Sequence, residues 1–113
     1  MNKYGKIWGS TTCLESNNSI EVHEIEFQQG KRCSFHCHNT KFNAFYVVEG
    51  ELEISVKKSN YDLTDVTILS KGDFTVVPPG EYHQFRGLTN GKALEVYWAE
   101  FNPNDIVRAN TGG

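Results

Sequence analysis

The stretch GKRCSFHCHNTKFNAFYVVEG, residues 30–50, contains the histidines around which the predicted fold is organised. His36 and His38 lie two residues apart in it. Because a β-strand turns alternate side chains to opposite faces, a strand over Arg32 to His38 would direct both imidazoles to one side. A third histidine, His83, follows in the segment GDFTVVPPGEYHQFRG. Two histidines on one strand and a third on a later strand form a natural metal site inside a β-barrel.

Short segments of alternating apolar and polar residues extend in both directions from this stretch. The clearest is ELEISVK, residues 51–57, which follows a tight turn at Glu49-Gly50. Such alternation is typical of half-buried strands, and Pro78-Pro79-Gly80 has the composition of a rigid turn. We predict strands over residues 20–28, 32–38, 43–48, 51–57, 61–69, 74–77, 82–86 and 93–101. Since no segment shows a helical period, the pattern indicates an all-β antiparallel sandwich or barrel.

The bulk properties narrow the function further. With 113 residues, we expect a single domain over residues 1–113. The net charge is −3 and no long basic run occurs, which argues against nucleic acid or an anionic membrane as a partner. No apolar stretch approaches the roughly 20 residues of a membrane span, and MNKYGKIWGS lacks the apolar core of a signal peptide. We therefore expect a soluble, cytoplasmic protein.

Three cysteines and two other residues have less specific interpretations. An odd number of cysteines without an export signal favours free thiols. In a regular strand, Cys33 and Cys37 would face away from His36 and His38. We expect His23 to be a surface or interface residue, and Trp8 to be a packing anchor or the wall of a pocket.

The two histidine segments together resemble the two motifs of the cupin superfamily. Residues 30–50 match the first motif as G-x5-H-x-H-x4-N-x6-G, and residues 72–87 match the second as G-x5-P-x-G-x2-H-x3-G. The resemblance implies a double-stranded β-helix, that is, a jelly-roll barrel, with a divalent Fe, Mn, Ni or Zn ion at its centre. It also implies that chains of this size commonly pair as homodimers.

Carried over by position, the resemblance makes His36, His38 and His83 metal ligands. Asn43 stands where the family usually has a glutamate ligand. An amide in place of a carboxylate removes one negative charge and a potential general base, and weakens the binding of hard cations. The Asn43 oxygen either coordinates the metal or holds a water.

Four residues are candidates for a substrate pocket. Phe45 and Val47 share strand parity with Asn43, so they are expected on the same face. Lys41 could bind an anionic group near the mouth of the barrel. Glu95 is the carboxylate of the last strand that we expect to point into the pocket.

A narrower resemblance is to the cupin domain of type II mannose-6-phosphate isomerases. It depends on Trp8-Gly9, on C-S-x-H-x-H over residues 33–38 with Lys41, and on DIVR over residues 105–108. That family usually has a glutamine where His36 stands, so the isomerase activity is not carried over. The expected ligand is a small polar molecule, sugar-like or phosphorylated. The chain is then a metal-dependent isomerase, epimerase or dioxygenase, a non-catalytic binding module, or a purely structural barrel.

Overall fold

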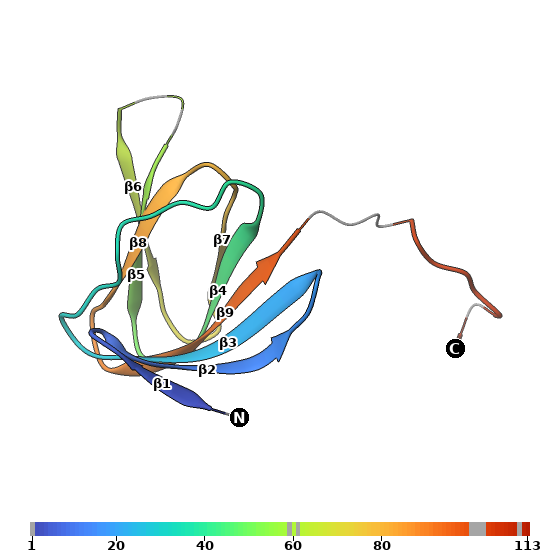
Figure 1. The fold of residues 1–113 in the computed structure, drawn as a ribbon, viewed down its shortest axis with the longest axis horizontal. Helices are drawn as coiled ribbons and strands as arrows, with labels where there is room; N and C mark the ends of the chain where they lie inside the picture. Colours follow the sequence, from blue (N-terminus) through green and yellow to red (C-terminus); the bar gives the residue numbers. More distant parts are fainter. Residues whose placement is uncertain (1, 59, 61, 100–103, 111) are drawn as a thin grey trace.

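The computed structural model describes residues 2–58, 60, 62–99, 104–110 and 112–113. Among these residues there are strands but no helix, and hence no helix long and apolar enough to cross a membrane. The strands, shown in Figure 1, are β1 (Lys3–Lys6), β2 (Gly9–Ser16), β3 (Ile20–Phe27), β4 (Phe42–Glu49), β5 (Leu52–Lys57), β6 (Thr64–Leu69), β7 (Phe74–Val77), β8 (Tyr82–Gly87) and β9 (Gly91–Trp98).

The strands form two antiparallel sheets that close around a common interior. One sheet has the order β1-β2-β3-β9-β4-β7, and the other has the order β6-β5-β8. Figure 1 shows the two sheets curving toward each other, with the chain segment between β3 and β4 passing across the open side. This arrangement confirms the predicted all-β jelly-roll barrel.

The alternation seen in the sequence places the core between the sheets. On β5, Leu52 and Ile54 are 0% and 1% exposed, and on β4 Phe45 and Val47 are equally buried. Each such side chain contributes about 1.5–3 kcal/mol to folding when it is fully buried. Because the side-chain period is two, the same strands must present their other residues to the outside.

Several predicted boundaries differ from the structure. The prediction of a regular strand over Arg32 to His38 is wrong: this segment makes only isolated bridges, Arg32 with Arg86 and His36 with His83. The segment leaves β3 of the larger sheet, runs beside β8 of the smaller sheet and returns to β4 of the larger one, and it touches β8 only at separate bridges instead of along a ladder. The last strand ends at Trp98. The predicted extension over residues 100–101 and the predicted start of a strand at residue 61 lie outside the described residues.

The N-terminal residues form a hairpin, β1–β2, that adds two strands to the edge of the larger sheet. Trp8 in its turn is 8% exposed and packs edge-on against Phe85, with ring centroids 4.9 Å apart. The following residue, Gly9, has a φ of 149°, and a Cβ there would collide with the Glu26 carbonyl. Glycine is therefore needed at the point where the hairpin turns its tryptophan into the barrel.

Candidate metal and ligand site

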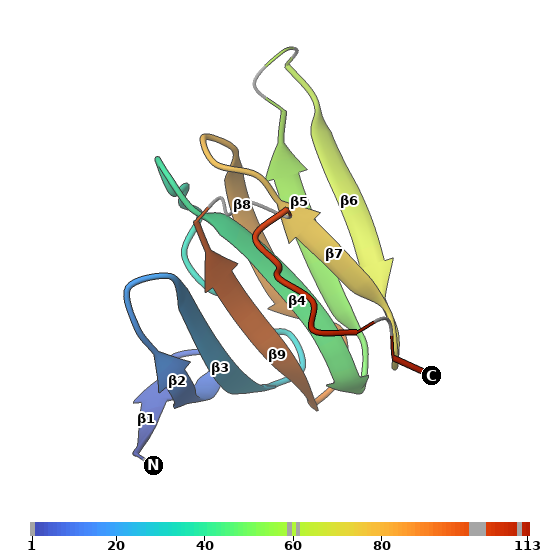
Figure 2. The ribbon, with the colours of Figure 1, turned by 90° about the vertical axis from the view of Figure 1, so that its right-hand side faces the viewer.

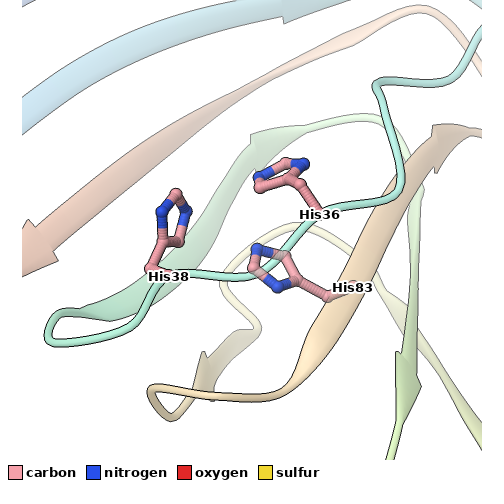
Figure 3. A group of neighbouring side chains, drawn as sticks. All are labelled: His36, His38 and His83. Carbon is pink, nitrogen blue, oxygen red and sulfur yellow. The ribbon is translucent and has the colours of Figure 1, made fainter.

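Two backbone hydrogen bonds set His36 directly opposite His83. The His36 amide donates to the His83 carbonyl (3.0 Å), and the His83 amide donates to the His36 carbonyl (2.7 Å). His38 is held by the Pro-Pro-Gly turn. The Gly80 amide donates to the His38 carbonyl (2.7 Å), and Gly80 has a φ of 84°. Figure 3 shows the three rings pointing toward one another, two from the segment before β4 and one from β8.

The spacing of the rings suits a single ion. One ring nitrogen from each of His36, His38 and His83 lies within 4.8 Å of the other two. Three nitrogens bound to one ion at about 2.1 Å in a tetrahedral arrangement lie about 3.4 Å apart. Ring nitrogens that are up to 4.8 Å apart therefore have to close by up to about 1.4 Å, through rotation of the side chains.

The hydrogen bonds made by Nδ1 of His83 and of His36 leave the lone pair of Nε2 free in each ring to bind an ion. Nδ1 of His83 lies 3.0 Å from the Glu81 carbonyl, and Nδ1 of His36 lies 2.8 Å from the Ser34 carbonyl. A carbonyl only accepts, so Nδ1 carries the proton in both rings and Nε2 carries the lone pair. Backbone carbonyls commonly orient metal-binding histidines in this way.

His38 also has the properties of a neutral ligand. Its Nε2 is buried and has no hydrogen-bond partner among the described residues. Burial, together with the positive charge of Lys41, lowers the pKa of His38 to about 4. Burial also lowers the pKa of His83. These rings are therefore held neutral, as a metal ligand must be.

Asn43 completes the group from β4. Its side chain is fully buried, with Oδ1 placed 2.9 Å from Nε2 of His83 and Nδ2 placed 3.4 Å from Oε2 of Glu95. In this orientation the lone pairs of Oδ1 and of His83 Nε2 face each other. A cation between them would remove that repulsion, so the donor set of three imidazoles and an amide oxygen fits a divalent metal.

A cavity of about 400 Å³ opens beside the histidines. The N-terminal hairpin, β3, β9, β8 and the segment before β4 all contribute to its wall. Its lining residues are Lys6, Ile7, Trp8, Thr11, His23, Cys33, Ser34, His36, Phe85, Glu95 and Tyr97. The wall thus combines aromatic surface with hydroxyl, carboxylate and imidazole groups, and His36 belongs both to the cavity and to the histidine group.

The polar wall opposite the histidines comes from β9 and β3. Glu95 is 9% exposed, and burial raises the pKa of its carboxyl. Burial and the neighbouring Glu95 carboxylate raise the pKa of Tyr97, so its hydroxyl stays protonated. His23 lies beside them, with its ring edge-on to Tyr97 at 5.9 Å and Nε2 3.2 Å from Glu21 Oε1. Together these groups offer donors and acceptors to a bound molecule.

The four predicted pocket residues fall in different places. Glu95 lines the cavity, whereas Phe45 and Val47 are 1% and 0% exposed and belong to the hydrophobic core. The Phe45 ring reaches toward His83, with centroids 6.5 Å apart. Lys41 lies over the Tyr97 ring, with Nζ 4.3 Å from the centroid, and contributes to a separate, smaller pocket.

Two expectations need correction. His23 is not a plain surface residue, since it lines the cavity together with Tyr97. Its signal was in the sequence: His23 shares strand parity with Ile25 and Phe27, which are 0% and 2% exposed. The expectation that Cys33 faces away from the interior is also wrong. Cys33 is 9% exposed and its Sγ accepts a hydrogen bond from the Phe85 amide (3.2 Å).

Comparison with known proteins agrees with this geometry. The chain is similar in structure to KdgF from Halomonas sp. (TM-score 0.76, 16% identity, covering 90% of this chain and 89% of KdgF). It also resembles the capsular polysaccharide assembling protein CapF from Staphylococcus aureus (TM-score 0.73, 24% identity, 92% of this chain and 30% of CapF). A third similar structure is oxalate decarboxylase from Bacillus subtilis, which has Mn(II) centres (TM-score 0.77, 14% identity, 92% and 29%).

The chain spans less than a third of the CapF and oxalate decarboxylase chains, and at these identities the likeness establishes the fold alone. No curated protein matches the sequence. The family model for the Cupin domain matches residues 23–100, which is more than half of the chain. The chain therefore belongs to the cupin family.

Proposed function

We propose that this cupin holds a divalent metal through His36, His38 and His83, with the Asn43 oxygen as a fourth donor, and uses it to bind a small polar molecule. Iron, manganese, nickel and zinc are the candidate ions. When bound, the ion supplies Lewis-acid polarisation of a ligand oxygen. The observation that carries the proposal is the convergence of three ring nitrogens within 4.8 Å of one another, with His36 also lining a cavity of about 400 Å³.

The cavity favours a hydroxylated, sugar-like ligand. Trp8 offers an aromatic surface, while Glu95 and the Tyr97 hydroxyl offer an acceptor and a donor for hydroxyl groups. Lys6 at the rim offers a positive charge to a carboxylate or phosphate group. The similarity in fold to a capsular polysaccharide assembling protein is in keeping with this ligand class.

Three candidate functions use the same site. A metal-dependent isomerase or epimerase needs a protein group that can exchange a proton with the ligand, and Glu95 is the buried carboxylate on the cavity wall. A metal-dependent dioxygenase would need iron and an open coordination position. A non-catalytic binding module is favoured by Asn43, because an amide replaces the acid expected at the fourth ligand position.

Metal analysis tests the first part of the proposal. The purified protein is stripped, loaded separately with Fe²⁺, Mn²⁺, Ni²⁺ or Zn²⁺, and its metal content is measured after desalting. We expect close to one ion per chain for at least one metal, and loss of that ion in His36→Ala, His38→Ala and His83→Ala. His23→Ala is the matched control, because His23 lies outside the histidine group and should leave the metal content unchanged. Absence of stable binding with all four metals would refute the metal site.

A ligand screen tests the second part. Thermal unfolding of the metal-loaded protein is followed with neutral sugars, uronic acids and sugar phosphates, and each stabilising compound is then followed by NMR over time. A compound that stabilises the wild type and changes chemically identifies an enzyme, and one that stabilises it unchanged identifies a binding module. If the ligand stabilises the His36→Ala variant as much as the wild type, the ligand binds independently of the metal.

Four narrower points stay predictions. These are that residues 1–113 form a single domain, that the chain pairs as a homodimer, that it is cytoplasmic, and that it shares ligand chemistry with type II mannose-6-phosphate isomerases. This chain matches the pattern of that family only in part, since His36 and Asn43 both differ from it.

A further inference from the structure

The proposed metal site has no negatively charged donor. His36, His38 and His83 bind an ion as neutral imidazoles, and Asn43 offers an amide oxygen. A divalent ion held by these groups keeps both of its positive charges. Figure 2 shows β4 and β9 in front of β8, and Asn43 and His83, which lie between these layers, are 0% and 1% exposed. In such a place charges interact more strongly than they do in water, so the sign of the surrounding charge matters for the ligand.

Two lysines add positive charge near the site. The Lys41 ammonium lies 4.3 Å from the centroid of the Tyr97 ring, and His38 packs edge-on against the same ring at 5.2 Å. Lys6 stands at the rim of the cavity that His36 lines. Within the part of the chain that the structure describes, neither lysine forms an ion pair with a carboxylate. Their charges are therefore available to a ligand.

The acidic groups around the site do not cancel this charge. Glu95 is the one carboxyl group on the cavity wall among the described residues, and its Oε2 lies 3.4 Å from Nδ2 of Asn43. Glu21 lines the smaller pocket beside Lys41, with its Oε1 3.2 Å from Nε2 of His23. Even when both carboxyl groups are ionised, a divalent ion and two lysines outweigh them. A concave site with this balance of charge selects an anion.

We infer that the ligand of this site is a sugar acid, which binds the ion through its carboxylate and through the hydroxyl on the neighbouring carbon. The inference rests on the proposed metal site and narrows its ligand class. A six-coordinate ion held by four protein donors has two positions left, and two oxygens of one molecule can fill both. The carboxylate supplies the negative charge that the protein lacks, because position 43 is an amide.

The rest of a sugar acid suits the cavity wall better than the alternatives do. Its remaining hydroxyls find partners in Glu95 and the Tyr97 hydroxyl, and its C–H groups find apolar surface in Trp8 and Phe85. A neutral sugar offers the same hydroxyls but leaves the charge of the ion uncompensated. A phosphate ester carries its charge beyond an ester oxygen, so its charged oxygens and the nearest hydroxyl form a larger chelate ring than the five-membered ring of a 2-hydroxycarboxylate.

Calorimetric titration of the metal-loaded protein with D-gluconate and D-glucitol tests this inference. The two compounds are a matched pair, because they differ only in a carboxylate that replaces a CH₂OH group. D-Glucose 6-phosphate is the third probe, an anion whose charge is on a phosphate. We expect gluconate to bind at least tenfold more tightly than either of the other two.

Two variants test whether the charge of the site is the cause. Asn43→Asp brings a negative charge into the protein, so gluconate affinity should fall about tenfold although the ion is retained. Lys41→Met removes a positive charge and should lower gluconate affinity about threefold at unchanged metal content. Lys92→Met is the matched control, because Lys92 lines neither the cavity nor the pocket beside Lys41 and should leave gluconate affinity unchanged.

The metal content of each sample, measured before and after the titration, separates this inference from the metal site itself. If protein with one ion per chain binds gluconate no better than glucitol, or does not bind it, the sugar acid is overturned and the metal site stands. Tighter binding of glucose 6-phosphate than of gluconate overturns it as well. So does unchanged gluconate affinity in folded, metal-loaded Asn43→Asp and Lys41→Met. Protein that retains no metal refutes the metal site, and this inference with it.

Discussion

Oδ1 of Asn43 on β4 lies 2.9 Å from Nε2 of His83 on β8, so an amide and an imidazole from opposite sheets meet at the centre of the barrel. His83 already uses Nδ1 to donate to the Glu81 carbonyl. Its Nε2 is therefore an acceptor facing another acceptor. This contact is the structural reason to expect that the residue at position 43 controls how strongly a cation is bound.

Asn43→Asp should tighten metal binding. The substitution keeps the size of the side chain and adds a negative charge beside the proposed ion, which hard cations such as Mn²⁺ prefer. We expect affinity for Mn²⁺ to rise at least tenfold in a competition titration with a chelator. The metal-free variant should be less stable than the wild type, because the new carboxylate lies next to Glu95 at the position where Nδ2 was 3.4 Å away.

The matched control is Asn90→Asp. Asn90 is exposed, its Oδ1 accepts a hydrogen bond from the Gln29 amide (2.9 Å), and it belongs neither to the histidine group nor to the wall of the cavity beside it. It should leave Mn²⁺ affinity unchanged. Equal affinity in wild type and Asn43→Asp would mean that the side chain at position 43 does not reach the ion.

The metal-free protein should lose stability in acid partly through His38. Burial lowers the pKa of His38 to about 4 in the folded state, so folding favours the neutral ring. A lowered pKa gives stability that is fully present above the ordinary value near 6.5 and is lost as the pH falls through about 4. Urea unfolding of wild type and His38→Gln at pH values from 7.5 to 4 measures this. The wild type should lose more free energy of unfolding over this range than the variant does; parallel pH profiles would contradict the assignment.

The packing of Trp8 should anchor the N-terminal hairpin to the barrel. The side chain is 8% exposed, packs on Phe85 and lines the cavity. Trp8→Ala should therefore cost about 3–5 kcal/mol in the free energy of unfolding, and Trp8→Phe considerably less. The neighbouring Ile7 is 84% exposed, so Ile7→Ala should change stability by less than about 0.5 kcal/mol. Denaturant unfolding of the three variants compares these values, and similar losses for Trp8→Ala and Ile7→Ala would show that the hairpin is not anchored by its tryptophan.

The convergence of His36, His38 and His83 agrees with the expectation from the two family motifs. The strand over residues 32–38 that was expected to direct His36 and His38 to one side is not formed, and the two rings are held instead by single bridges to β8 and to the turn at Gly80. The strands were also predictable, because Leu52, Ile54 and Val56 alternate with polar residues regardless of what packs on them. The family resemblance added the expectation that the strands close into a jelly-roll barrel.

The cavity could not be predicted in the same way. Its wall includes Lys6, Ile7 and Trp8, which reach the histidines through the pairing of β2 with β3, and no local pattern encodes that contact. Cys33 was placed on the wrong side because parity holds only in a regular strand, and residues 32–38 make only isolated bridges to β8. His23 is different: the buried neighbours Ile25 and Phe27 would have placed it inward.

Glu95→Gln should have opposite effects on two properties: it should not reduce the stability of the metal-free protein at pH 8, but it should weaken ligand binding. Burial raises the pKa of this carboxyl, so its favourable contribution is present below the ordinary pKa near 4.5 and is lost as the pH rises through the folded-state value. As the pH rises, ionising this buried carboxyl costs free energy in the wild type, whereas glutamine does not ionise. We expect the metal-free variant to be at least as stable as the wild type at pH 8, and to lose that advantage at pH 4.5.

The same substitution should weaken the binding of a hydroxylated ligand. A hydrogen bond to a carboxylate contributes about 1.5–3 kcal/mol, more than one to a neutral amide, so about tenfold lower affinity is expected once a ligand is identified. Glu53→Gln is the control, because Glu53 pairs with Arg86 (3.3 Å) away from the cavity. Calorimetric titration of the metal-loaded proteins compares the two variants. If Glu95→Gln binds as tightly as Glu53→Gln, the ligand does not contact this wall of the cavity, and the polar groups of β9 serve the barrel rather than the ligand.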